Sequence, residues 1–164
     1  MQSTAGLSPA QQAFAAAGVP ILRRTRPAGD FTVPLAAGGA RSIQELAGKA
    51  VFLNFWAGWC GPCRNEMPSM EKLYQKFEPR GLEILAVNYA EKPETVRAFM
   101  AENRLSFPVG LDVSGRITAL YGVTAFPTTY IIDREGQVIA RVAGSIEWDA
   151  PELLAAFAAL LEQE

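Results

Sequence analysis

The chain has 164 residues, of which 49% are hydrophobic and 20% charged, and its formal net charge is −2. This length suits one domain with its own core, and the composition is that of a soluble globular protein rather than a disordered or fibrous one. The balanced charge provides no field that would attract nucleic acid, and no apolar run reaches the ~18 residues that a membrane-spanning helix needs.

The start of the chain is predicted to be a helix followed by a linker. Ser8, Pro9 and Gln11 are typical of a helix start, with a hydroxyl cap, a proline in the first turn and a glutamine that reaches back to the cap. Glycine and proline then end the helix, and further glycines and prolines with short apolar stretches indicate a linker that leads into a hairpin. We therefore divide the chain into residues 1–27, a helix and linker, and a domain over residues 28–164.

The middle of the chain predicts a strand, a helix and a second strand. The run AVFLNFWA, residues 50–57, is nearly continuously apolar, which is typical of a strand buried on both faces. Residues 61–77 show a helical period that continues beyond Pro68, so this proline is expected to kink the helix without ending it. LEILAVNY, residues 82–89, is a second buried strand. Together they predict a βαβ unit with two parallel strands.

The second half of the chain predicts an inserted helix and strand, a hairpin and a closing helix. A helix begins at Pro93, FPVGLD follows as a short strand, and a brief helix comes next. TTYIID and QVIARV, joined by turn residues, indicate an antiparallel hairpin. Asp149 and Glu152 are expected to cap the last helix on either side of Pro151.

The only two cysteines, Cys60 and Cys63, lie in the sequence WCGPC, where a buried strand gives way to a helix. A helix N-terminus offers unpaired amide donors and a positive dipole end, and both favour the reactive thiolate. We therefore expect Cys60 to be an accessible nucleophile. Cys63, one turn further on, would attack the mixed disulfide formed at Cys60 and release the partner. Pro62 fits the first turn, where its missing amide hydrogen has no partner to lose.

Three other interpretations of the cysteine pair are less favoured. A structural zinc site needs four ligands, and the chain has two cysteines and no histidine. A purely structural disulfide across so short a loop would add only about 2 kcal/mol of stability. Two inert buried thiols would not require Gly-Pro between them at a strand-to-helix turn. We expect neither a metal nor a cofactor.

These residues also carry a family resemblance. NFWAGWCGPCR resembles the active-site segment of thioredoxins, and the longer FLNFWAGWCGPCRNEMPSMEKL resembles the TlpA/ResA-like branch of bacterial extracytoplasmic thiol-disulfide oxidoreductases. YGVTAFPTTYIIDREG resembles the segment with the family's cis-proline, and residues 91–113 match the branch's insertion. The resemblance covers residues 28–162. It implies an α/β, thioredoxin-like fold, a central mixed β-sheet flanked by helices, with an N-terminal β-hairpin and a helix-strand insertion.

The resemblance also assigns a substrate-binding surface. Pro127 would be the cis-proline, whose loop lies against the cysteine pair and offers backbone groups to an extended substrate segment. Phe126 would shape the substrate groove, and Trp59 would be exposed beside it. Gly61 and Pro62, between the cysteines, complete the expected binding residues.

A proton acceptor for the second cysteine is less clearly marked. Thioredoxin itself has a buried aspartate where this chain has Asn54, and an amide does not accept that proton. In the TlpA/ResA-like branch a glutamate three residues after the second cysteine is thought to serve instead, and Glu66 occupies that place. Three residues along a helix bring Glu66 near the face of Cys63. The alternative is an acid favoured in the first helical turns by the helix dipole alone.

We expect a monomeric reductase that breaks disulfides in an extracytoplasmic client, such as an apocytochrome c or a copper-site protein, and that an upstream thiol donor restores. The resemblance implies a periplasmic location, with any export signal or membrane anchor carried by a removed N-terminal segment, and the sequence leaves a cytoplasmic location open. Alternatives are a disulfide oxidase or isomerase, and a non-enzymatic thiol chaperone or copper carrier, since soft thiolates suit Cu(I). A peroxidase of the peroxiredoxin type is disfavoured because no cysteine lies outside the pair.

Overall fold

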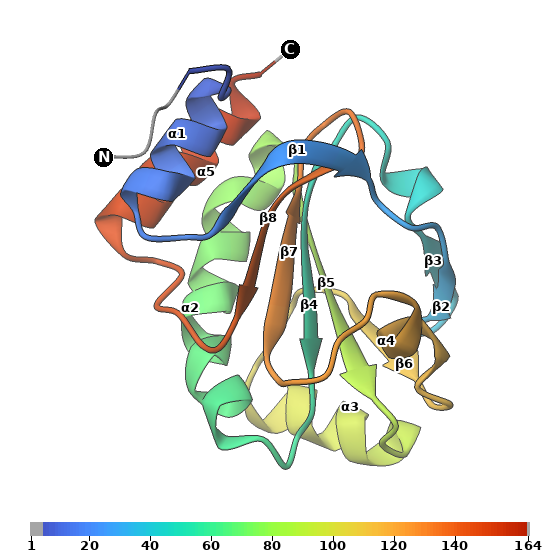
Figure 1. Ribbon diagram of the computed structural model, residues 1–164. Helices are drawn as coiled ribbons and strands as arrows, with labels where there is room; N and C mark the ends of the chain where they lie inside the picture. The colour runs from blue at the N-terminus through green and yellow to red at the C-terminus, as the bar shows by residue number, and fades with distance from the viewer. Residues whose placement is uncertain (1–4, 164) are drawn as a thin grey trace.

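The computed structural model describes residues 5–163, so the first four residues of the predicted N-terminal segment lie outside it. A six-stranded mixed sheet, with the order β1-β8-β7-β4-β5-β6, runs through the molecule with helices around it (Figure 1). The strands are β1 (Ile21–Pro27), β2 (Thr32–Pro34), β3 (Ala40–Ser42), β4 (Ala50–Trp56), β5 (Leu82–Tyr89), β6 (Val109–Asp112), β7 (Thr128–Ile132) and β8 (Gln137–Ala143). The helices are α1 (Pro9–Ala16), α2 (Gly61–Phe77), α3 (Pro93–Glu102), α4 (Arg116–Leu120) and α5 (Pro151–Leu161), with short 3-10 turns at Gln44–Leu46 and Glu78–Arg80.

Strand β4 lies in the middle of the sheet and leads directly to the cysteine pair. It pairs in parallel with β5 and antiparallel with β7, so the predicted βαβ unit and the mixed sheet are both found. All seven of its residues are buried. Its side chains alternate between two cores, with Phe52 and Trp56 on one face and Leu53 and Phe55 on the other. The continuous apolar run in the sequence follows from this double burial.

The two faces of the sheet are covered by different elements. Buried side chains of α1, α2, α3 and α5 form the core on one face, where Phe14 of α1 meets Phe157 of α5 edge to face with ring centroids 5.0 Å apart. Figure 1 shows α1 and α5 side by side. The predicted hairpin, β2 paired with β3, lies with α4 over the other face. The predicted insertion is α3 followed by β6, and β6 extends the sheet beside β5.

The N-terminal segment differs from the prediction after its first helix. Helix α1 begins as expected, because Ser8 and Gln11 exchange side-chain-to-backbone hydrogen bonds of 2.9 and 3.1 Å. The expected linker, however, is partly strand β1, which pairs antiparallel with β8 at the sheet edge. The sequence did not predict this strand, because most of β1 is exposed and it therefore lacks the apolar run that marks a buried strand. The division into residues 1–27 and 28–164 stays a prediction.

The expected cap of the last helix is also wrong. Ala150 is the N-cap residue of α5, and no side chain caps the helix there. Asp149 lies one residue too early for that role and forms an ion pair with Lys72 of α2 at 3.7 Å instead. Pro151 does occupy the first turn, where it is tolerated. Pro68, as predicted, lies inside α2 without ending it.

Within residues 5–163, the helices are all too short or too polar to span a lipid bilayer. The longest, α2, has 17 residues and carries the cysteine pair at its beginning. Its first turn lies at the end of the sheet where β4 finishes (Figure 1). The fold therefore brings the cysteines, the end of β4 and the segments after β5 to one end of the molecule.

Candidate active site

The cysteine pair forms a disulfide at the start of α2, with its Cα atoms 5.3 Å apart. Cys60 is the N-cap residue, and the backbone N–H of Cys63 donates to its sulfur at 3.2 Å. Cys63 is fully buried, whereas Cys60 keeps 7% of its surface exposed. Of the two sulfur-bearing side chains, only that of Cys60 reaches the surface, and its role as the nucleophile stays a prediction. The sulfur is much less exposed than the accessible nucleophile that the sequence led us to expect.

The loop before β7 closes over the pair. The peptide bond between Phe126 and Pro127 is cis, as predicted, and β7 begins at the next residue, Thr128. The carbonyl oxygen of Phe126 lies 3.5 Å from the sulfur of Cys60. This backbone oxygen and the exposed edge of Cys60 thus share one small area of surface.

Aromatic rings surround this area. Trp59 is 64% exposed, as expected, and meets Phe126 edge to face with ring centroids 5.9 Å apart. Tyr89, at the end of β5, also packs against Phe126, with ring centroids 5.1 Å apart, a contact that the sequence did not indicate. Gly61 and Pro62 form the first turn of α2, and Pro62 is exposed. The residues expected to bind substrate are therefore brought together, while their binding role stays a prediction.

Glu66 lies almost fully buried on α2, one turn after Cys63, with 1% of its surface exposed. Its Oε1 atom accepts a hydrogen bond from Nδ2 of Asn54 at 2.9 Å. Its Oε2 atom accepts from Nε1 of Trp148 at 3.0 Å and from the backbone N–H of Ile146 at 3.2 Å. Burial raises the pKa of Glu66 to about 7, against the opposing effect of these hydrogen bonds, of which that from Trp148 is the strongest.

This environment suits a group that exchanges a proton near neutral pH. The donors to Glu66 are uncharged, and no ion pair to it is found within residues 5–163. A small pocket of about 100 Å³ reaches Glu66 between α2 and the segment after β8, where Ser145 and Glu147 line it. Water in this pocket would give Glu66 a proton route to solvent. Its role as proton acceptor for Cys63 stays a prediction.

Several residues that build the site come from distant parts of the sequence. Trp148 lies 82 residues after Glu66, and Thr129 of β7, 75 residues after Asn54, accepts from Asn54 at 3.0 Å. Glu91, after β5, accepts a hydrogen bond from the backbone N–H of Gly58. No local pattern marks such partners, since each contact depends on how the sheet is assembled. In the described part of the chain, no group of three or more metal-ligating side chains gathers.

Residues 25–141 match the AhpC/TSA family. The thiol-disulfide oxidoreductase ResA of Bacillus thuringiensis is 41% identical over 115 residues, which cover 70% of this chain but only 66% of that relative, just under two thirds. A crystal structure of a putative thiol:disulfide interchange protein DsbE from Chlorobium tepidum is 34% identical and superposes with a TM-score of 0.77 over 84% of this chain and 97% of the other. A secreted disulfide oxidoreductase of Mycobacterium tuberculosis, described as homologous to E. coli DsbE, is 25% identical with a TM-score of 0.70, over 79% and 96%. The fold is thus thioredoxin-like, as predicted.

Proposed function

The chain belongs to the AhpC/TSA family, and from this membership and its cysteine geometry we propose that it is a thiol-disulfide oxidoreductase that reduces disulfides in client proteins. The observation that carries the proposal is the asymmetry of the pair. Cys60 caps a helix and retains exposed surface, while Cys63 is fully buried one turn away. Such a pair suits two successive thiol exchanges, the first with a partner and the second within the chain.

The reaction begins from the dithiol form. The Cys60 thiolate attacks one sulfur of the client disulfide, a mixed disulfide forms, and the other client sulfur leaves as a thiolate that takes up a proton. Cys63 then loses its proton, attacks the Cys60 sulfur and releases the second client thiol. The client gains two electrons and two protons, and the chain ends with the Cys60–Cys63 disulfide. An upstream thiol donor then returns it to the dithiol.

Within this scheme, Glu66 would accept the proton that Cys63 loses. Its burial, its pKa of about 7 and its place one turn after Cys63 support this role. Asn54 and Trp148 would hold the carboxylate in place through their hydrogen bonds. Trp59, Phe126 and the backbone beside Pro127 would face the client.

We further propose that the clients are extracytoplasmic, such as an apocytochrome c or a protein with a copper site. The names of the relatives support the redox class, and the secreted Mycobacterium tuberculosis protein supports the compartment. A peroxidase of the peroxiredoxin type is disfavoured, because the sequence has no cysteine beyond the pair.

A trapping experiment tests the proposal. In the Cys63→Ala variant, the mixed disulfide at Cys60 has no internal thiol to resolve it, so clients should accumulate as covalent adducts that dithiothreitol releases. The matched Cys60→Ala variant should trap far less, because Cys63 is fully buried. If neither variant forms adducts in the native compartment, the result contradicts the reductase proposal and favours a thiol chaperone or copper carrier.

The direction of electron flow needs a second measurement. A redox titration of the wild-type pair against glutathione or dithiothreitol gives its reduction potential. A potential between the ≈ −200 mV of glutaredoxins and the ≈ −270 mV of thioredoxin, or below, fits a reductase, whereas a value near ≈ −120 mV is that of a strong oxidant. The latter result would contradict the proposed direction and favour a disulfide oxidase or isomerase.

A further inference from the structure

Strand β1 forms an open edge of the six-stranded sheet. Within residues 5–163 it pairs only with β8, whereas β6, at the opposite edge, is partly covered by a bridge from the turn between β2 and β3. The side chain of Gln11 holds the carbonyl oxygen of Leu22 at 2.8 Å, so the open part of β1 is residues 23–27, all of them exposed. An exposed edge strand offers backbone N–H and C=O groups to which a strand of another protein can add.

This edge carries a concentrated positive charge. The first 29 residues contain three arginines, Arg23, Arg24 and Arg26, and no acidic residue, whereas the remaining 135 residues contain twelve basic and seventeen acidic ones. No hydrogen bond or ion pair holds the guanidinium group of Arg24 or Arg26 within residues 5–163. Exposed guanidinium groups without an internal partner are available to bind carboxylates of another molecule.

A pocket of about 280 Å³ lies beside the end of β1. Its lining includes Arg26 of β1, Tyr130 of β7, and Leu120 and Tyr121 at the end of α4. The hydroxyl group of Tyr130 accepts from Nε of Arg141 at 3.0 Å and donates to the carbonyl oxygen of Tyr121 at 2.7 Å, so the aromatic wall is held in place. Leu120 is 60% exposed at the rim. Apolar and aromatic walls with an arginine beside them are typical of a protein-binding surface.

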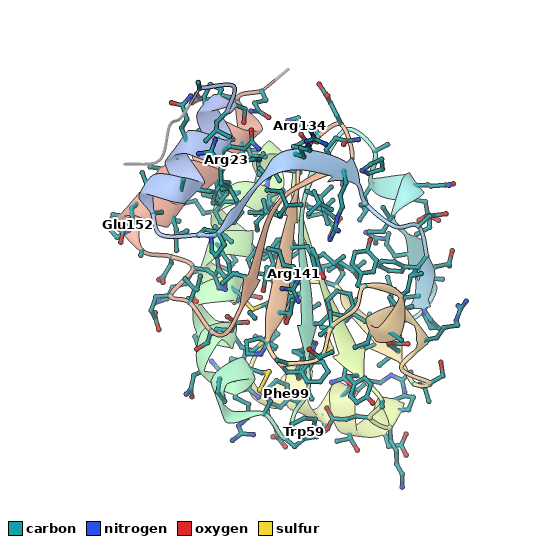
Figure 2. The ribbon with its side chains drawn as sticks, viewed as in Figure 1. Arg23, Trp59, Phe99, Arg134, Arg141 and Glu152 are labelled. Carbon is teal, nitrogen blue, oxygen red and sulfur yellow. A yellow bond between two sulfur atoms is a disulfide. The ribbon has the colours of Figure 1, made fainter. Side chains whose placement is uncertain are left out.

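We propose that β1 and this pocket form a docking surface for an acidic, extended segment of a partner protein. The segment adds as a strand to the open edge of β1, its carboxylates pair with Arg24 and Arg26, and one apolar side chain enters the pocket. A second copy of this chain does not fit, because two β1 strands side by side would set arginine against arginine. Figure 2 shows Arg23 of β1 and Trp59 of the cysteine loop toward opposite ends of the molecule, so docking leaves the cysteine pair accessible.

A synthetic peptide tests the inference. The probe has seven residues, in which glutamates and one leucine alternate with threonines, and it is titrated into the isotope-labelled full chain in its disulfide form. Binding should shift the NMR signals of the β1 amides and slow their hydrogen exchange, because the added strand occupies N–H groups. The same peptide with N-methyl groups on alternate backbone amides keeps the charge but loses the donors for strand pairing, and it should bind at least about tenfold more weakly. Replacing the leucine with alanine should weaken binding about tenfold, because the pocket then holds a smaller side chain.

Charge-reversal variants locate the surface. The double variant Arg24→Glu/Arg26→Glu should weaken binding at least about tenfold, and raising NaCl from about 50 to about 500 mM should weaken wild-type binding by a similar factor. The matched double variant Lys92→Glu/Arg104→Glu changes the net charge equally at two exposed positions on either side of α3. It should keep the wild-type affinity within about twofold. The NMR spectrum of each variant shows directly whether it is folded.

The outcomes decide the inference independently of the reductase function, because binding to the oxidised chain involves no redox step. A wild-type chain that does not bind the peptide, or binds it with shifts away from β1, contradicts the inference. Equal binding of the N-methylated peptide would mean that no strand is added. Equal losses in the two double variants would mean that net charge alone governs binding. If the chain binds phosphatidylglycerol vesicles and not the peptide, the basic strand serves a lipid surface and the inference is wrong.

Discussion

Glu66 and Glu83 are both buried carboxyl groups, and they meet opposite surroundings at opposite ends of the sheet. Glu66, near the cysteines, is 1% exposed and receives hydrogen bonds only from uncharged donors. Glu83 of β5, 6% exposed, forms ion pairs with Arg41 at 3.0 Å and Lys49 at 3.8 Å. Figure 2 marks the two ends by Arg134 at the top, which holds backbone carbonyls of three segments, and Trp59 at the bottom.

The contrast teaches how the groups around a buried carboxyl group set its pKa. Burial raises the pKa of both carboxyl groups, but Arg41 and Lys49 oppose the effect at Glu83. Without a cation, Glu66 reaches a pKa of about 7, where the charged and neutral forms are both populated under working conditions. A paired carboxylate holds strands together, whereas an unpaired one that donors orient is available for proton exchange.

The largest expected effect is kinetic and follows from Glu66→Gln. If Glu66 accepts the Cys63 proton, this change should slow release of the client from the mixed disulfide about 10²-fold, the usual size of a general-base contribution. Single-turnover mixing of reduced protein with a peptide disulfide measures that step. Glu83→Gln, at the far end of the sheet, is the matched control and should leave the rate unchanged.

The pH profile of the same step separates catalysis from mere structural support. In the wild-type protein the rate should rise with pH and level off above about 7, because Glu66 accepts a proton only as the carboxylate. Glu66→Gln should lose this inflection, and Glu83→Gln should retain it. An inflection near 7 that persists in Glu66→Gln would assign Glu66 a structural role alone.

An effect of about the same size is expected in the pH dependence of stability. The unfolded Glu66 titrates near 4.5 and the folded one near 7, so the folded state binds the proton more tightly. This stabilisation is complete below pH 4.5 and is lost as the pH rises through 7, a change of about 3 kcal/mol. Urea unfolding of the wild-type protein and of Glu66→Gln at several pH values measures the difference.

Glutamine is a fair mimic of the protonated acid, so Glu66→Gln should gain stability relative to wild type as the pH rises from 4.5 to 7. The matching difference for Glu83→Gln should have the same sign and a smaller size, because Arg41 and Lys49 offset part of the desolvation. If the free energy of unfolding depends on pH equally in the two variants, the ion pairs do not distinguish Glu83 from Glu66, and the comparison is wrong.

Local patterns in the sequence were enough to predict the helices and strands that bury a periodic apolar face, and to pick out the cysteine pair. The strand at residues 50–57, the helix at residues 61–77 and the cis bond before Pro127 all lie where they were predicted. Each is marked by a contiguous motif or period. The exposed edge strand β1 has no such period. The cap expected at Asp149 is wrong, because α5 begins one residue later than that cap requires and Ala150 is its N-cap residue.

The hydrogen-bond partners around the site could not be predicted from the sequence, for a different reason. Glu66 was found as a candidate by its spacing from Cys63, but the donors that orient it, Trp148 and Ile146, lie 82 and 80 residues away. The anchoring of Gly58 by Glu91 spans 33 residues, which include α2 and β5. Such contacts form only when the tertiary structure is assembled, and the sequence around each residue carries no pattern that identifies its hydrogen-bond partner.

The smallest effects are expected from removing the ion pairs of Glu83, and they test whether these pairs stabilise the fold. Arg41→Ala removes the charged hydrogen bond to a nearly buried carboxylate and should lower the free energy of unfolding by about 1–2 kcal/mol, reduced from the usual value because Arg41 is itself 27% exposed. Lys49→Ala, whose side chain is 52% exposed at 3.8 Å, should cost at most about 0.5 kcal/mol. Urea unfolding at low salt and at 1 M NaCl tests both, because salt should abolish the Lys49 effect and spare part of the Arg41 effect.

Neither variant should change the rate of disulfide reduction, since the pairs lie at the end of β5 away from the cysteines. A loss of activity in Arg41→Ala would mean that the two ends are coupled through the sheet and are not separate in function.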